Sequence, residues 1–432
     1  MGVGDIDNID FLAVASEASA ASVGKAALRK LDDVASLTHV ASHAANRSVA
    51  QQAVSRLSDE QALLQVAKSA RDAIVAKSAV KKLHTQDLLA EVVRSKVDPL
   101  VSKTAMKRLT DQQLLSDLLR EEESPEIRRL TIDKSSDEQQ LTDIACNDAE
   151  TETSAAALAK LTSRSALAQV ATTASAASVR ILALARIRDG VVLARMARTD
   201  VDADVRSAAL EHLRSPRLLA EVALEGEHAD ARVWALRRVK DKSIVAQVAV
   251  KDPSPKVRSE ALRGVDDQDV FAKIAAADSS WQVRRNAVRK LRDRKAVAER
   301  ATQDPAWQVR EAAVDKLRDQ AMLCTLAQWD EAWQVRRAAM RRVKKDALLI
   351  KRGRTDDDAR VRLVAVKRVS DPSMLANRAQ CDDDAEVRLA ATRKTDNRSV
   401  LREIAAHDSD ASVRKAAQEQ LDELDAPPES QP

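Results

Sequence analysis

The sequence is poor in the residues that build most globular cores and most turns. Its 432 residues include no tyrosine, two phenylalanines, five tryptophans, seven glycines and ten prolines. Aromatic side chains supply much of the buried area of an ordinary core, so this chain has to pack small aliphatic side chains over many close helix contacts. Few glycines and prolines leave little material for β-turns. The composition therefore predicts an all-α fold, and no strands are expected.

Cysteines and long apolar segments are also scarce. The three cysteines, Cys146, Cys324 and Cys381, are far apart and lack a C-x-x-C spacing, so neither a disulfide framework nor a zinc site is indicated. This usage fits a reducing compartment, and we expect a cytoplasmic location. The first residues do not form a basic segment followed by an apolar run, so no signal peptide is expected. No apolar stretch approaches ~18 residues, so no membrane span is expected.

A repeat of 26 residues runs through the chain. The segment Trp-Gln-Val-Arg occurs three times, beginning at Trp281, Trp307 and Trp333, and these copies set the spacing. We call the valine of each copy, and its equivalent in every other unit, the register position. It recurs from Val23 to Val413 without a slip.

The residues around the register position predict two helices in each unit. Four residues past it, fifteen of the sixteen units have alanine, and Thr131 is the exception. A methyl group there lets neighbouring helices approach closely. Aliphatic residues such as Val283, Val288 and Leu291 complete one apolar face, which predicts a helix of about ten residues. A capping residue such as Asp293 should then start a second, shorter helix.

The repeat also sets the expected domain boundaries. Counted from Asp7, sixteen units form a single solenoid over residues 7–422. Residues 1–6 are expected to form a leader and residues 423–432 a disordered tail. Residues 121–160 contain eleven acidic and four basic residues, with polar residues at normally apolar positions, which predicts a softer joint there.

The segments Asp304-Pro-Ala-Trp-Gln-Val309-Arg310 and Asp252-Pro-Ser-Pro-Lys-Val257-Arg258 resemble the Asp-Pro-x-x-x-Val-Arg signature of HEAT repeats. The resemblance covers essentially the whole chain, in a compact 26-residue form of the bacterial type. It implies a right-handed α-solenoid of sixteen two-helix HEAT-like repeats. It also implies that the Val-Arg helix is the second of each hairpin and lines the concave surface.

Arginine directly follows the register position in ten consecutive units, from Arg180 to Arg414. Many of these units also have aspartate five residues before the register position. A partly buried ladder of Arg–Asp pairs would tie adjacent loops together. We therefore assign this row to the scaffold.

Seven residues past the register position, thirteen of sixteen units have lysine or arginine. The position borders the apolar face, so these side chains either form a charged stripe for a partner or cover the core edge with their aliphatic stems. Residues 251–360, with 26 basic and 18 acidic residues, reinforce the stripe. Trp281, Trp307 and Trp333 stand beside it and serve either as a binding row or as loop plugs. The candidate partner-binding residues are Lys290, Lys316, Arg342, Arg368, Lys394, Arg289, Arg341, Trp281, Trp307 and Trp333.

The sequence contains no recognisable catalytic or cofactor motif. His39 and His43 are four residues apart but lack the intervening glutamate and a third ligand of a metalloprotease site, and no P-loop, dinucleotide fingerprint or nucleophile elbow is present. We therefore expect no catalytic residues, no metal and no cofactor. The leading hypothesis is a protein-binding scaffold whose concave basic face docks an acidic protein segment. A nucleic-acid-binding solenoid is the alternative, and a repeat-built base-excision or lyase enzyme is a more remote one.

Overall fold

The computed structural model describes residues 10–121 and 124–425. In this part of the chain 32 helices follow one another in antiparallel pairs, and no strand occurs. The chain divides into two compact units, Met1–Leu218 and Leu219–Pro432, with the division inside one helix. The predicted all-α repeat solenoid of sixteen two-helix units is confirmed.

The helices of the first compact unit are α1 Phe11–Glu17, α2 Ala21–Leu28, α3 Val34–His43, α4 Arg47–Arg56, α5 Glu60–Ser69, α6 Ala73–Val80, α7 Gln86–Arg94, α8 Pro99–Arg108, α9 Gln112–Glu121, α10 Pro125–Lys134, α11 Glu138–Asn147, α12 Thr151–Lys160, α13 Arg164–Thr173, α14 Ala177–Leu184, α15 Gly190–Thr199 and α16 Ala203–His212. The division falls within α17 Pro216–Glu225. The helices that follow are α18 Ala229–Leu236, α19 Lys242–Lys251, α20 Pro255–Ala261, α21 Gln268–Ala277, α22 Trp281–Lys290, α23 Arg294–Gln303, α24 Trp307–Val314, α25 Gln320–Trp329, α26 Trp333–Met340, α27 Asp346–Thr355, α28 Ala359–Arg368, α29 Pro372–Cys381, α30 Ala385–Thr392, α31 Arg398–His407 and α32 Ala411–Asp425.

The odd-numbered helices begin at the predicted capping residues. Asp319, for example, accepts hydrogen bonds from the amides of Ala321 (2.8 Å) and Met322 (3.2 Å) and so caps α25. The expected length order was wrong, because most odd-numbered helices have ten residues and are not shorter than the even-numbered helices, which range from seven residues in α20 through ten in α22 to fifteen in α32. The odd-numbered helices run uninterrupted from the capping residue to the loop aspartate, and this distance fixes their length.

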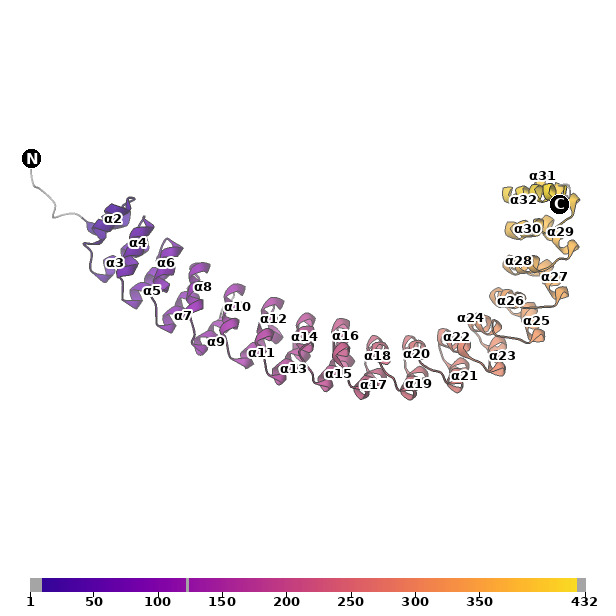
Figure 1. Ribbon diagram of the computed structural model, residues 1–432, viewed down its shortest axis with the longest axis horizontal. Helices are drawn as coiled ribbons and strands as arrows, with labels where there is room; N and C mark the ends of the chain where they lie inside the picture. The colour runs from indigo at the N-terminus through magenta and orange to yellow at the C-terminus, as the bar shows by residue number, and fades with distance from the viewer. Residues whose placement is uncertain (1–9, 122–123, 426–432) are drawn as a thin grey trace, which may run out of the picture. The chain divides into compact units, whose positions relative to one another are not determined.

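The two helices of each repeat form two layers. Within each compact unit, odd-numbered helices lie in one layer and even-numbered helices in the other (Figure 1). In the second unit, the even-numbered helices from α20 to α32 lie on the inner side of the curve that the repeats make (Figure 1). The Val-Arg helix is thus the second of its hairpin and, in this unit, lines the concave side.

The alanines four past the register position form a buried seam between packed helices. Ala287 and Ala313 have no exposed surface, and Thr131, the one exception, is equally buried. The Thr131 hydroxyl donates to the carbonyl oxygen of Ile127 at 2.8 Å, which satisfies its polar atom inside the helix. Close helix packing therefore depends on a small side chain at this position.

Replacing Ala313 with leucine is expected to destabilise the protein by ~1–3 kcal/mol, because the extra methylenes overpack a filled seam. Hydrogen exchange should locate the loss of protection in α22, α24 and α26, since each repeat touches only its neighbours. Ala321→Leu, at an exposed position of α25, is the matched control and should change stability little. Equal loss of protection in α4 and α30 would contradict this prediction.

Two of the expected boundaries differ from the structure or lie outside it. Helix α32 continues through Asp425, into the segment 423–432 that was expected to be disordered. Arg398 explains the extension, because it donates to the carbonyl oxygen of Leu424 at 2.6 Å and pairs with Asp425 at 3.1 Å. Residues 1–6, the expected leader, and 426–432 lie outside the described residues. The softer joint at 121–160 stays a prediction.

Candidate binding surface

A buried ladder of Arg–Asp pairs connects the loops of successive repeats. The pairs are separated by 2.7–2.9 Å and comprise Arg180–Asp200, Arg232–Asp252, Arg258–Asp278, Arg284–Asp304, Arg310–Asp330, Arg336–Asp356, Arg362–Asp382 and Arg388–Asp408. Each arginine also donates through Nη1 to two carbonyl oxygens of its own loop, as Arg310 does to Asp304 (2.9 Å) and Pro305 (3.2 Å). The assignment of this row to the scaffold is confirmed, because its donors are used inside the protein.

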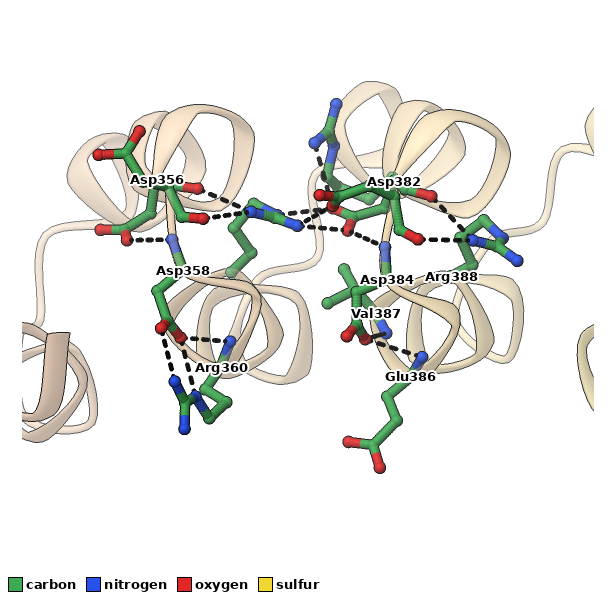
Figure 2. A network of polar contacts seen from close by, with 12 residues as sticks. Asp356, Asp358, Arg360, Asp382, Asp384, Glu386, Val387 and Arg388 are labelled. Carbon is green, nitrogen blue, oxygen red and sulfur yellow. Dashed lines mark hydrogen bonds and ion pairs between the residues drawn. The ribbon is translucent and has the colours of Figure 1, made fainter.

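The ladder is extended in the repeats that contain Asp356 and Asp382. Figure 2 shows Asp382 at the centre of one such network, where it accepts from the amide of Asp384 at 3.1 Å while its carbonyl oxygen accepts from Arg388 at 3.0 Å. A second guanidinium reaches each aspartate from the preceding helix, from Arg352 to Asp356 and from Arg378 to Asp382. These two arginines replace aliphatic residues in the sequence pattern, and they join the ladder.

Because its aspartates titrate, the ladder makes the free energy of unfolding depend on pH. Burial opposes ionisation of Asp408, but hydrogen bonds from Arg388 and from the amide of Asp410 outweigh it, so the pKa of Asp408 lies below its ordinary value of 3.8. The pKa of Asp382 is lowered in the same way. A carboxyl with a lowered pKa stabilises the folded state above the ordinary pKa, and this contribution is lost as the pH falls through the lowered value.

We therefore expect the free energy of unfolding in urea to be steady around neutral pH and to fall steeply below about pH 4. Asp408→Asn should lower stability at neutral pH and flatten this acid dependence, because the titrating group is gone. An unchanged acid slope in Asp408→Asn would contradict the prediction.

The row seven past the register position caps the helices of the preceding repeat. Lys290 Nζ donates to the carbonyl oxygen of Leu262 at 2.6 Å, and Lys394 Nζ donates to those of Val366 (3.0 Å) and Lys367 (3.1 Å). Lys316, Arg342 and Arg368 make the same kind of contact with the end of the preceding even-numbered helix. Cations at a helix C-terminus satisfy free carbonyl oxygens and oppose the helix dipole.

This contact changes the interpretation of five candidate residues. Burial lowers the pKa of Lys316 and of Lys394, which fits ammonium groups held against the protein. Sequence reasoning placed the row at the edge of the apolar face but could not find its acceptors, because they belong to another repeat. We assign Lys290, Lys316, Arg342, Arg368 and Lys394 to helix capping, and their contact with a partner stays a prediction.

One residue earlier, a second row of cations points outward from the even-numbered helices of the second compact unit. This position lies opposite the buried register valine and seam alanine on the helix. We call these residues the exposed cationic row. They are Arg237, Arg263, Arg289, Arg341, Lys367 and Arg393, all exposed, with exposed Asp315 between Arg289 and Arg341.

Most of the exposed cationic row has no ionic partner. Glu260 pairs with both Arg237 and Arg263 at 2.9 Å. No described carboxylate lies within ion-pair distance of the remaining four cations, of which the sequence pattern singled out Arg289 and Arg341 but missed Lys367 and Arg393. At the same position the first compact unit has exposed Arg29, Lys81 and Lys107, but Ser55, Asp133, Ala159, Ala185 and Glu211 interrupt them, so cations follow one another over several repeats mainly in the second unit.

The three tryptophans begin α22, α24 and α26 and are half-buried. Their rings make no contact with one another. Arg337 and Arg360 lie over the ring of Trp333, with Cζ 5.0 Å and 3.3 Å from its centroid. Arg337 also approaches Glu311 of α24 at 3.8 Å. Trp333 is therefore already stacked on cations of the protein itself.

We also searched the described residues for a metal site and for a membrane-spanning helix. Over residues 10–121 and 124–425, no group of three or more histidine, cysteine, aspartate or glutamate side chains is placed to hold a metal ion. His39 and His43 stack on each other at a centroid distance of 4.6 Å. Within the same ranges, every helix is too short or too polar to cross a membrane.

The fold defines a protein of the α-helical repeat solenoid class. Neither a family model nor a curated protein matches the sequence. Among solved structures, one of the UNC-45 chaperone, described for binding and folding muscle myosin, aligns with 96% of this chain and 52% of that chain. The identity is 12% and the TM-score 0.21. The chain thus spans about half the length of that protein.

Proposed function

We propose that this protein is a non-catalytic scaffold whose even-numbered helices bind an acidic segment of a partner protein. The exposed cationic row carries the proposal, because Arg289, Arg341, Lys367 and Arg393, interrupted once by Asp315, have no carboxylate partner in the described structure. A row of unneutralised charges along the C-terminal ends of the even-numbered helices attracts a ligand of opposite charge and aligns it along the repeats. The proposal includes a cytoplasmic location, which the three free cysteines support.

The tryptophans that begin α22, α24 and α26 favour a protein ligand over a nucleic acid on this face, whereas the exposed Trp329 belongs to α25 in the other layer. Single-stranded nucleic acids bind sequence-tolerant grooves by stacking their bases on available aromatic rings. The Trp333 ring is occupied by two guanidinium groups, and Trp281 and Trp307 are half-buried at helix starts. A ligand that relies on carboxylates needs no free ring.

The repeat spacing predicts the spacing of charges in the ligand. Packed helices lie ~8–10 Å apart, and an extended chain advances ~3.3 Å per residue. One repeat therefore matches about three ligand residues. In a polyproline II segment, which has three residues per turn and rises ~3.1 Å per residue, acidic residues at every third position lie on one side and would place one carboxylate beside each cation. The residue opposite Asp315 should be neutral or basic.

Titration of the full-length protein with synthetic peptides tests this function. A peptide with glutamate at every third position should bind at least about tenfold more tightly than one of the same composition with its glutamates clustered, a difference of ~1.4 kcal/mol. Equal affinity for both peptides would contradict alignment along the row. An unrelated single-stranded DNA that displaces the peptide at equal charge concentration would favour the nucleic-acid alternative.

A further inference from the structure

A groove with a basic rim lies between two odd-numbered helices, in the layer opposite the exposed cationic row. It has a volume of about 810 Å³ and is bounded by α23, α25 and the loops that precede them. Val297 and Leu317, both buried, and half-buried Met322 form part of its floor. Sites of a few hundred to about 1,000 Å³ with an apolar floor and a few polar groups are typical of ligand binding.

Four exposed cations surround this floor, and none of them forms an ion pair with a carboxylate of the described residues. They are Arg292, Arg294, Lys295 and Arg318. Asp319 is the one acidic residue in the lining, and its carboxylate is held by the amides that it caps at the start of α25.

The nearest cation of the scaffold responds to this excess of positive charge. Lys316 is committed to capping α22, through the carbonyl oxygen of Arg289 at 2.7 Å. Its pKa is lowered first by burial and then by the charge of Arg292. The groove therefore has a positive potential that the described residues leave unneutralised.

The same combination recurs five repeats earlier in the sequence. A cavity of about 560 Å³ between α13 and α15 is lined by Arg164, Arg186 and Arg188, the equivalents of Arg294, Lys316 and Arg318. Leu167 and Ile187 stand at the positions of Val297 and Leu317.

Neither groove follows from the repeat alone. One repeat beyond α23, the positions of Arg294 and Lys295 are taken by Gln320 and Ala321. The cavity between α9 and α11 is lined by Asp137, Asp143 and Asp148 together with Arg120 and Arg128, so its lining has no excess of cations. A basic rim over an apolar floor is thus a property of particular repeats.

We propose that the groove between α23 and α25 binds a short acidic segment of a partner protein that carries a bulky apolar residue. The apolar side chain would pack on Val297 and Met322, and flanking carboxylates would pair with Arg294, Lys295 and Arg318. The groove lining contains no aromatic residue on which a base could stack, which favours a peptide over a nucleic acid. This site goes beyond the exposed cationic row and rests on the proposed binding function only for the nature of the partner.

The test uses the full-length protein and a short synthetic peptide with one central leucine flanked by glutamate and aspartate. Arg294→Gln combined with Lys295→Ala installs the residues that the next repeat has naturally, so the fold should tolerate the change. It should weaken binding by at least about tenfold. Lys251→Gln with Lys273→Gln removes the same charge from exposed positions of the same helix layer and should leave affinity within about twofold.

Two further measurements separate this site from general charge attraction. Replacing the peptide leucine with serine should weaken binding by about tenfold, because the apolar contact is lost. Reversing Lys367 and Arg393 of the exposed cationic row, which belong to later repeats and do not line the groove, should leave this peptide's affinity within about twofold. The proposal fails if the two double variants weaken binding equally, or if replacing the peptide leucine does not change the affinity. If this peptide does not bind but the regularly spaced acidic peptide does, the proposed function of the exposed cationic row is unaffected.

Discussion

Replacing Asp304 with alanine is expected to cost about 3–5 kcal/mol and to open the repeats on both sides of it. The Asp304 side chain has no exposed surface and accepts from Arg284 Nε (2.8 Å) and Nη2 (2.9 Å) and from the amide of Ala306 (2.9 Å). Its removal leaves the guanidinium of Arg284, about 10% exposed, without a counter-charge. The loss should appear as faster hydrogen exchange in α22, α23 and α24.

Two controls distinguish the effect of leaving a buried charge unpaired from the effect of removing any aspartate. Asp266→Ala removes one partner of an exposed pair with Lys242, in which the Asp266 and Lys242 side chains are 77% and 76% exposed, and should change the stability little. Arg284→Met combined with Asp304→Leu removes both buried charges and should cost clearly less than Asp304→Ala alone. Similar losses for Asp304→Ala and Asp266→Ala would show that the ladder does not stabilise the loops.

The ladder could be predicted because both of its members appear in the sequence at fixed places. Arginine after the register position and aspartate five residues before it repeat with the same period, and pairing of opposite charges between adjacent loops follows. The seam alanines could be predicted for the same reason. A contact made identically in many repeats leaves a periodic signal in the sequence, which one sequence is enough to reveal.

Contacts that differ between repeats left no such signal. Arg352 and Arg378 stand at normally aliphatic positions of odd-numbered helices, and each reaches a ladder aspartate. Gly353 looks like a lost alanine, but an added Cβ would lie 2.0 Å from the Met374 side chain and 2.9 Å from the Cβ of Ala365. The glycine therefore makes room for a larger neighbour, which only the packed structure reveals.

The exposed cationic row was partly missed because the adjacent row is more regular. The capping position has lysine or arginine in thirteen of sixteen units, since a helix end has to be satisfied in nearly every repeat. The exposed position is basic mainly in the second compact unit, where packing places no demand on it. A residue that repeats everywhere tends to hold the scaffold together, and a residue that repeats in one region is the better candidate for binding.

Combined replacement of Arg289, Arg341 and Lys367 with glutamate is expected to weaken binding of the regularly spaced acidic peptide by on the order of 100-fold. Each exposed contact contributes up to about 1 kcal/mol, and reversal adds a repulsion of similar size. Helicity and stability should be nearly unchanged, because acidic residues occupy the same position naturally at Asp133 and Glu211. Single reversals should each have a small effect.

Replacing Asp315 should strengthen binding on the same surface, whereas the triple reversal weakens it. Asp315→Lys completes the run of cations from Arg263 to Arg393, so a peptide with glutamate at every third position should bind several-fold more tightly than it binds the parent protein. The preference for a neutral or basic residue opposite this position should disappear at the same time. Isothermal titration at low and at physiological salt measures both effects, and the gain should shrink as salt screens the exposed charges. If the triple reversal and Asp315→Lys both leave affinity unchanged, the partner does not bind along this row, and the groove between α23 and α25 becomes the remaining candidate surface.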